Sequence, residues 1–374
     1  MKKTTKNTLN NPPKTKVTMQ DIADRLGISK NSVSQALSGK DGVSEETRRT
    51  VVRTAAEMGY AYSENRGRRR EDSAQESGSI ALIASDFAFS QKGFFGEIYL
   101  TIEDEAARRG KNLLIQSVSR QAADSLTLPS FIESGGVEGV LILSHITTGY
   151  IRKVIDTGIP TVLIDHHHPF IRTDCILTNN RFSAYEAVRH LAELGHSRLG
   201  FIGNTALSPS YDERLDGFRL AQRELGLPES DESWIVRNAE EDSEFVGRLV
   251  RRLEASDRMP TAWFCVNDGF GYYLNSALQQ AGLRVPQDVS VVSFDNGYLS
   301  RLAVPPITTL DVDLALYGRR AVARLLERIE RPDEPFTELL LPTKLLTRGS
   351  SGPAPDAEQA AEAANAAASR GMRG

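Results

Sequence analysis

Apolar positions between Ser79 and Phe294 come in short continuous runs that alternate with amphipathic stretches. The runs cover residues 80–84, 113–118, 140–143, 161–164, 199–202, 262–266 and 289–294. The stretches between them close at glycine, as in 94–109 before Gly110, 182–194 before Gly195 and 270–281 before Gly282. Continuous apolar strands separated by helices are typical of parallel sheets that are buried on both faces. About nine such units in about 270 residues exceed one core, so the pattern predicts two α/β lobes.

The N-terminal region has a different pattern, with three short helical segments between Thr18 and Gly59. Thr18, Ser29 and Ser44 stand at the three expected N-cap positions, and Asp21 completes a capping box with Thr18. Gly27 ends the first segment. Each segment is too short to be a stable helix alone, so the three are expected to pack as one bundle.

The first two segments form a helix, a tight glycine turn and a second helix, which is helix-turn-helix geometry. The second helix directs Val33, Ala36 and Leu37 inward and leaves four polar residues outside: Lys30, Asn31, Ser34 and Gln35. Lysine, asparagine and glutamine are residue types that contact base edges in the major groove. Any solvated helix can carry such residues, but the glycine turn and the N-terminal position favour DNA binding.

Charge along the chain supports this interpretation. The 374 residues include 45 Lys plus Arg and 49 Asp plus Glu, a net charge of −4. Residues 1–70 hold 15 basic and 7 acidic residues, which leaves 30 basic and 42 acidic residues for the rest. A basic head on an acidic body indicates a polyanionic partner for the head.

Several classes of protein are disfavoured by the sequence. It has no stretch of 18 apolar residues and no signal-peptide pattern, so neither a membrane partner nor secretion is expected. Cys175 and Cys265 sit in apolar runs and indicate reduced thiols of a cytoplasmic protein. Phosphate-loop, dinucleotide, zinc-protease and nucleophile-elbow motifs are missing, so no enzyme activity, cofactor or metal is expected. The consecutive residues His166, His167 and His168 would point to opposite sides of an extended chain, which suits a pocket wall better than one metal ion.

The N-terminal motifs resemble the headpiece of the LacI/GalR family of bacterial transcription regulators. They are VTMQDIADRLGISKNSVSQALS at 17–38, VSEETR at 43–48 and Gly59-Tyr60. Body motifs in the family's order are VEGVLI at 137–142, LGHSRLG at 194–200, ERLDGF at 213–218, PTA at 260–262, VND at 266–268, VPQDVS at 285–290, FDN at 294–296 and PITTL at 306–310. The resemblance covers about residues 17–348.

The resemblance implies an all-α helix-turn-helix headpiece joined to an effector domain like the two-lobed α/β periplasmic sugar-binding proteins. The expected parts are a disordered arm (1–16), the headpiece (17–62), an arginine-rich linker (63–78), the effector domain (79–349) and a disordered tail (350–374). Lobe one would hold 79–178 and 311–335, and lobe two 179–310 and 336–348, with crossings near Asn179, Asp311 and Phe336. It further implies a homodimer on a near-palindromic operator, and a small effector, expected to be a sugar, that changes lobe closure and headpiece spacing.

Site residues follow from the same resemblance, position by position. Lys30, Asn31 and Gln35 match base-reading positions, while Ser29, Ser32 and Ser34 would face phosphates or the groove floor. In the cleft, Arg214 matches the ligand-gripping arginine, Asp295 the acid after the late strand, and Asn267 and Asp268 the polar pair after the preceding strand. Phe94 and Phe95 match an aromatic pair, and Asp86, His166 and Tyr211 are further candidates. The alternatives are that Arg214 and Asp295 form only a structural salt bridge, and that one phenylalanine of the pair faces the core.

Two rival functions stay open. The first is a sugar-binding receptor without a gene-regulatory role, which would need a signal peptide and no headpiece. The second is a regulator controlled by a protein that docks on the first lobe.

The linker departs from the family pattern. The family usually has an apolar hinge helix with a leucine that wedges into the minor groove, whereas this chain has Arg69 near that position. Gly67 disfavours a helix. Arg66, Arg68, Arg69 and Arg70 instead suit a narrow minor groove or phosphate neutralisation, unless the linker is only a tether.

This departure generates a prediction for binding at different salt concentrations. A dimer carries two linkers and therefore eight of these arginines. If half of them contact phosphate, changing all four positions to serine should flatten the slope of log affinity against log salt by about 3–4 units, since each phosphate contact contributes about 0.9. Operator affinity measured over a salt series tests this. An unchanged slope would mean that the linker is a tether.

Overall fold

The computed structural model describes residues 17–37, 42–58, 60, 78–90, 93–143, 146–255 and 259–355. They fall into two units, one before Ser77 and one from Ser77 onward. The expected arm (1–16), the linker arginines and tail residues 356–374 lie outside the described residues. In the described ranges no helix is long and apolar enough to cross a lipid bilayer.

The N-terminal unit is the predicted three-helix bundle. Its helices are α1 (Met19–Leu26), α2 (Lys30–Leu37) and α3 (Glu45–Glu57). Thr18 and Asp21 form the predicted capping box, and Gly27 adopts a left-handed conformation with φ of 65°. The hydroxyl groups of Ser29 and Ser44 accept hydrogen bonds from the backbone of their helices, so all three predicted caps are confirmed.

The second unit contains two six-stranded sheets. The first sheet has the order β11-β5-β4-β3-β1-β2 and is parallel throughout. Its strands are β1 (Ser79–Ser85), β2 (Asn112–Val118), β3 (Gly139–Leu143), β4 (Thr161–Ile164), β5 (Asp174–Thr178) and β11 (Glu338–Leu341). The second sheet has the order β12-β10-β9-β8-β6-β7, with only the β10–β12 pair antiparallel. Its strands are β6 (Leu199–Ile202), β7 (Ile235–Val236), β8 (Ala262–Cys265), β9 (Ser290–Asp295), β10 (Thr308–Val312) and β12 (Thr343–Leu346).

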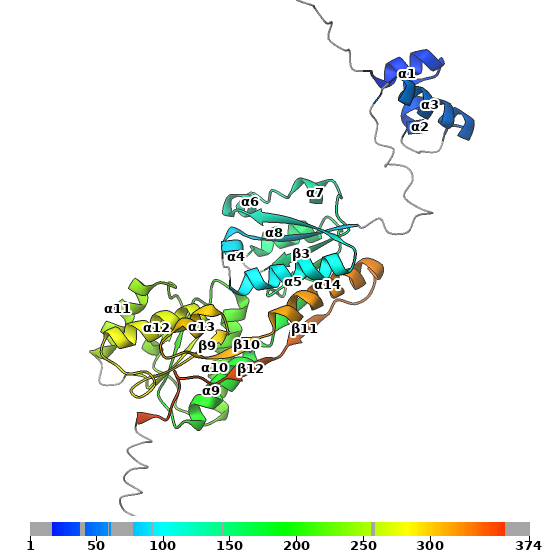
Figure 1. Ribbon diagram of the computed structural model, residues 1–374. Coiled ribbons are helices and arrows are strands. Elements are labelled where there is room, and N and C mark those ends of the chain that lie inside the picture. The colour runs from blue at the N-terminus through cyan, green and yellow to red at the C-terminus, as the bar shows by residue number, and fades with distance from the viewer. Residues whose placement is uncertain are drawn as a thin grey trace, which may run out of the picture. The chain divides into compact units, whose positions relative to one another are not determined.

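Helices cover both faces of each sheet, which explains the continuous apolar runs. In the first sheet, Ile80 and Leu82 face the cluster that includes α5 and α14, and Ala81 and Ile83 face the cluster beneath α6, α7 and α8. Figure 1 shows α5 and α14 side by side on the first lobe. The helices of this unit are α4 (Asp86–Ser90), α5 (Phe94–Arg108), α6 (Arg120–Asp124), α7 (Ser130–Glu133), α8 (Thr148–Ile155), α9 (Asn180–Glu193), α10 (Pro209–Glu224), α11 (Ser243–Glu254), α12 (Asp268–Gln280), α13 (Tyr298–Leu302) and α14 (Leu314–Glu330), with a 3-10 turn at Glu232–Trp234.

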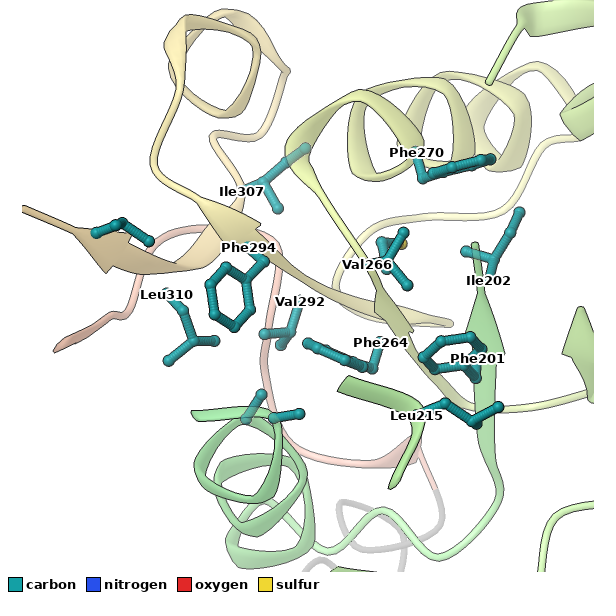
Figure 2. Close-up of a cluster of buried hydrophobic side chains, with 14 of the residues drawn as sticks. Phe201, Ile202, Leu215, Phe264, Val266, Phe270, Val292, Phe294, Ile307 and Leu310 are labelled. Atoms are coloured by element: carbon teal, nitrogen blue, oxygen red, sulfur yellow. The ribbon is translucent and has the colours of Figure 1, made fainter. Parts of the chain in front are cut away.

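The second lobe is built around an aromatic core. Phe201 and Phe264, on neighbouring strands, have ring centroids 6.0 Å apart, and Phe218 of α10 lies 5.8 Å from Phe201. Figure 2 shows Phe270 of α12 and Leu215 of α10 packing on opposite sides of these strands. This core fixes the strand ends that carry the polar residues described below.

The chain passes between the two lobes three times, and the third crossing corrects the sequence analysis. It leaves the first sheet at Asn179 after β5, and it returns after Val312, from β10 into α14. The third passage lies at Pro342, between β11 and β12, and not near Phe336. Residues 338–341 therefore complete the first sheet. Their side chains are mostly exposed at the sheet edge, so the pattern gave no buried-strand signal.

The start of the predicted tail is also ordered. Ser350 is fully buried, and its hydroxyl accepts a hydrogen bond from the Thr308 amide at 2.8 Å. The amide of Ala354 donates to the carbonyl of Leu194 at 2.8 Å. Residues 350–355 thus belong to the second lobe, because their backbone groups find partners there that a polar composition does not reveal.

Helix α14 is attached to the first lobe through a buried carboxylate. Asp174 is 0% exposed and accepts hydrogen bonds from Arg328 Nε at 2.7 Å, Arg324 Nε at 2.8 Å and the Thr337 amide at 2.9 Å. Burial alone would raise the pKa of the Asp174 carboxyl, but these hydrogen bonds outweigh it and hold the pKa below its usual range. The cluster therefore joins β5, α14 and the segment before β11.

We predict that Arg328→Met will destabilise the body by about 3–5 kcal/mol, because it removes one partner of a buried charge. Urea unfolding of the full chain measures this. The matched control is Arg284→Met, which breaks an exposed pair with Asp288 and should cost less than about 1 kcal/mol. Since the folded-state pKa of Asp174 is lowered, its contribution is complete above the unfolded pKa and is lost as the pH falls through the folded pKa. Equal losses for the two variants at neutral pH would contradict the prediction.

Candidate functional site

The outer face of α2 carries the predicted DNA-contacting residues. Ser29, Lys30 and Asn31 are exposed, and Ser32, Ser34 and Gln35 are partly buried. On the other face, Val33, Ala36 and Leu37 pack in the bundle core. The first turn of α2 thus presents its polar groups to solvent while the bundle fixes the direction of the helix.

Arg48 of α3 holds the opposite end of α2. Its Nη1 lies 3.3 Å from the carbonyl oxygen of Ala36 and 3.4 Å from that of Gln35. These are carbonyls of the last helical turn, which have no acceptor role within the helix. A cation there also opposes the negative end of the helix dipole, so α3 stabilises the position of α2.

Arg214 is the central residue of the cleft region in the second lobe. It lies on α10 and is 2% exposed. Its Nε donates to Asn180 Oδ1 at 2.9 Å, and its Nη1 donates to the carbonyl of Val266 and lies 3.4 Å from Asp295 Oδ1. The guanidinium carbon is 3.5 Å from the centroid of the Phe294 ring. Arg214 and Asp295, which are far apart in the sequence, are therefore neighbours in space.

Two carboxyl groups beside Arg214 have raised pKa values. The pKa of Asp295 is raised to about 7, mainly by burial. Arg214 lowers this pKa, while the negative charges of Asp268, Asp165 and Glu241 raise it. Burial likewise raises the pKa of Asp268 to about 6, against hydrogen bonds that include one from Thr309 Oγ1 at 2.8 Å. Groups that titrate near neutral pH at the ends of strands are typical of ligand sites.

Asn267 connects the start of α12 to α10 and to the loop before α11. Its side-chain oxygen caps α12 by accepting from the Phe270 amide at 2.9 Å. Its Nδ2 donates to the Tyr211 hydroxyl at 2.9 Å and to Glu241 Oε2 at 2.8 Å. Glu241 was missed by the sequence analysis, because it precedes α11 in a polar loop without any motif.

A cavity of about 90 Å³ lies between the lobes, and one of the two predicted phenylalanines lines it. Phe94 of the first lobe lines it together with Asp295 and Asn296 of the second lobe and Asp311 near the crossing. Phe95 instead packs in the core and is 7% exposed, so it is not placed to contact a cleft ligand. Adjacent residues of a helix point in different directions, which is why one of the pair turns inward.

The remaining candidates occupy strand ends of the first lobe. Asp86 follows β1, is exposed and accepts a hydrogen bond from the Ser117 hydroxyl. His166 follows β4 and is 7% exposed. The neighbouring residues Asp165 and His167, which were not predicted as site residues, make the contacts to the second lobe: Ser210 Oγ donates to Asp165 at 2.8 Å, and His167 Nε2 lies 2.7 Å from Glu213 Oε1. The described residues contain no group of three or more histidine, cysteine or acidic side chains arranged to hold a metal ion.

A helix-turn-helix bundle joined to a two-lobed α/β body with a polar cleft defines a ligand-responsive DNA-binding protein. Comparisons with known proteins agree. Residues 18–63 match the profile of bacterial regulatory proteins of the lacI family, and residues 188–351 match that of the periplasmic binding protein-like domain. The transcriptional repressor PurR of Glaesserella parasuis is 30% identical over 329 residues, which cover 87% of this chain and 94% of the relative. The chain belongs to the LacI family of bacterial regulatory proteins.

Other relatives and solved structures extend the comparison. The transcriptional regulator DegA of Bacillus subtilis is 28% identical over 347 residues, covering 90% of this chain and 99% of the relative. A CelR–cellobiose complex superposes with a TM-score of 0.66 at 26% identity, covering 90% of this chain and 100% of that one. The lac repressor dimer bound to operator has a TM-score of 0.65 at 23% identity, with the same coverage, which shows the shared fold.

The polar outer face of α2 generates a prediction. Lys30→Ala and Gln35→Ala should each weaken operator binding by about 1–3 kcal/mol and relax specificity at one base position. Binding to operator and to random DNA is compared for each variant. An equal loss on both DNAs would leave these residues only a phosphate-contacting role.

Proposed function

We propose that this protein is a cytoplasmic repressor of carbohydrate-utilisation genes. It binds a near-palindromic operator as a homodimer, and a sugar in the interlobe cleft controls that binding. The observation that carries the proposal is the pairing of Arg214 with Asp295 beside the cavity, in a chain that also has a helix-turn-helix.

The chemistry of the cleft suits a polyhydroxylated ligand. A guanidinium donates to hydroxyl oxygens and a carboxylate accepts from hydroxyl hydrogens, so Arg214 and Asp295 can hold neighbouring hydroxyl groups of one sugar. Phe94 supplies an apolar ring on the opposite lobe. Two relatives support this class of ligand: the ribose operon repressor of Haemophilus influenzae, at 29% identity, and CelR, solved with cellobiose.

Control follows from the position of the cleft. A ligand that contacts Phe94 in one lobe and Asp295 in the other, both of which line the cavity, binds better to one separation of the lobes than to others. It thereby shifts the population of lobe arrangements, and with it the spacing of two headpieces in a dimer. The linker arginines Arg66, Arg68, Arg69 and Arg70 contact operator phosphates in this proposal.

A regulator controlled by a docking protein is the alternative. One observation favours it: the first lobe has an open hollow of about 450 Å³, bordered by Arg152, Arg172 and the 76% exposed Phe170. Failure of every sugar to bind, combined with protein-dependent release from the operator, would favour this function over the proposed one.

The proposed function is tested by ligand binding to cleft variants. A thermal-shift screen of the full chain against mono- and disaccharides selects the sugar, and calorimetry then compares variants. Arg214→Ala and the milder Asp295→Asn should each weaken sugar binding about 10- to 100-fold, since a hydrogen bond to a charged group contributes about 1.5–3 kcal/mol. In Asp295→Asn, operator binding without sugar should stay within about twofold of the wild type, as should all properties of the surface control Arg284→Ala. Unchanged sugar affinity in both cleft variants would contradict the assignment.

A further inference from the structure

Two interlobe contacts lie close together between the loop after β4 and the first turns of α10. Ser210 Oγ donates to Asp165 Oδ1 at 2.8 Å, and His167 Nε2 lies 2.7 Å from Glu213 Oε1. The other ring nitrogen of His167, Nδ1, is 3.5 Å from Glu338 Oε1 on β11. Asp165, His167 and Glu338 belong to the first lobe, and Ser210 and Glu213 to the second.

These contacts share one face of α10 with the arginine of the cleft. Ser210, Glu213 and Arg214 have the spacing i, i+3 and i+4, so their side chains lie on the same side of the helix. The second oxygen of Glu213, Oε2, accepts from Asn180 Nδ2 at 2.9 Å, and Asn180 Oδ1 accepts from Arg214 Nε at 2.9 Å. A continuous chain of hydrogen bonds therefore runs from His167 in the first lobe to Arg214.

We propose that His167 and Glu213 form a latch that holds the two lobes together when the imidazole is protonated. The latch sets the balance between the lobe arrangements. That the ligand acts on this balance rests on the proposed function. The contact itself does not depend on which ligand binds.

Protonation matters because both ring nitrogens face carboxylates. A neutral imidazole has one N–H and can donate to only one of them, whereas an imidazolium can donate to both. The charged groups opposite the ring are Glu213 from α10 and Glu338 from β11; His166 and His168 flank it on its own loop. Asp165, two residues before His167, accepts a hydrogen bond from Ser210. Arg214 is linked to Glu213 through the side chain of Asn180.

The direction of titration follows from these neighbours. The hydrogen bond with Glu213 raises the pKa of His167, burial lowers it, and attraction to Glu213 and Glu338 raises it again, with a net rise. Burial raises the pKa of Glu213, but the bonds from His167 and Asn180 outweigh it, so Glu213 stays ionised. The latch is therefore fully formed below the ordinary histidine pKa, about 6.5. It is weakened as the pH rises through the raised pKa of His167, because the neutral ring has no charge and only one N–H to donate.

The contact is sheltered enough to matter. The side chains of His167 and Glu213 are 28% and 30% exposed, so solvent screens the pair less than it screens a surface ion pair. Loss of one charge-assisted hydrogen bond is enough to change the ratio of the two arrangements about tenfold between acidic and alkaline pH. A change of that size is measurable without ligand or DNA.

The test is the interlobe distance of the full chain, measured by single-molecule energy transfer from pH 5.5 to 8.5. Dyes are attached at Lys153→Cys on the first lobe and Gln280→Cys on the second, both exposed positions. The native thiols Cys175 and Cys265 are 2% and 0% exposed and do not take up dye. We expect the ratio of short-distance to long-distance molecules to fall about tenfold as the pH rises, with loss of this step in His167→Gln and in Glu213→Gln.

Controls separate the latch from other titrating groups. His168→Gln removes the neighbouring imidazole and should keep the step. Glu338→Gln keeps the Glu213 contact and should move the midpoint of the step to lower pH, which tests the proposal even if the other variants fold poorly. A pH step that persists in His167→Gln, or a wild type without any step, would overturn the latch. Because no sugar is present, failure of the latch is distinguishable from failure of the proposed function, which is judged by sugar binding to Arg214→Ala.

Discussion

The burial of one guanidinium group, that of Arg214, determines how the second lobe is built. A buried cation is tolerated only where hydrogen-bond acceptors surround it. Asn180 at the start of α9, the carbonyl after β8 and Asp295 at the end of β9 supply them, and the Phe294 ring covers one face. The ends of these elements must therefore lie within a few ångströms of α10. The strand ends beside the cavity are held in place as a result, before any contact with the first lobe is counted.

Asp174, which is fully buried, and Asp295, which is partly buried, show how the surroundings of an aspartate set its charge state. Asp174 has two arginines and a backbone amide to itself, and its pKa is lowered. Asp295 shares one arginine with three nearby acids, and its pKa is raised to about 7. The first is fully compensated and holds α14 in place. The second is compensated only in part, so a ligand that brings hydroxyl donors to it has something to stabilise. The same residue type thus supports the structure in one lobe and, in the proposed function, binds the ligand in the other.

The sequence predicted the parts of this molecule whose signals are local. Continuous apolar runs marked the strands buried on both faces, and serine or threonine caps marked the three headpiece helices. Strands such as β10, with Thr308 and Thr309 in its core, and the exposed edge strand β11 carried no such signal, and the third crossing was misplaced as a consequence. Arg214 and Asp295 were found through the family resemblance. The contact of His167 with Glu213 could not be predicted from the sequence, because it forms only where the two lobes, each with its own sheet, meet.

The interleaving of the lobes has a consequence for synthesis of the protein on the ribosome. The headpiece is complete within the first 60 residues, with all its core contacts local in sequence. The first lobe begins at β1 but lacks α14 and the edge strand β11 until residue 341 has been made. Until then, the face of its sheet that α14 covers, including Leu141 and Val162, has no permanent neighbour in the nascent chain. Non-local closure of this kind is slow and leaves apolar surface open to chaperones or to aggregation, so the first lobe should reach its native state only after residue 341 has been made.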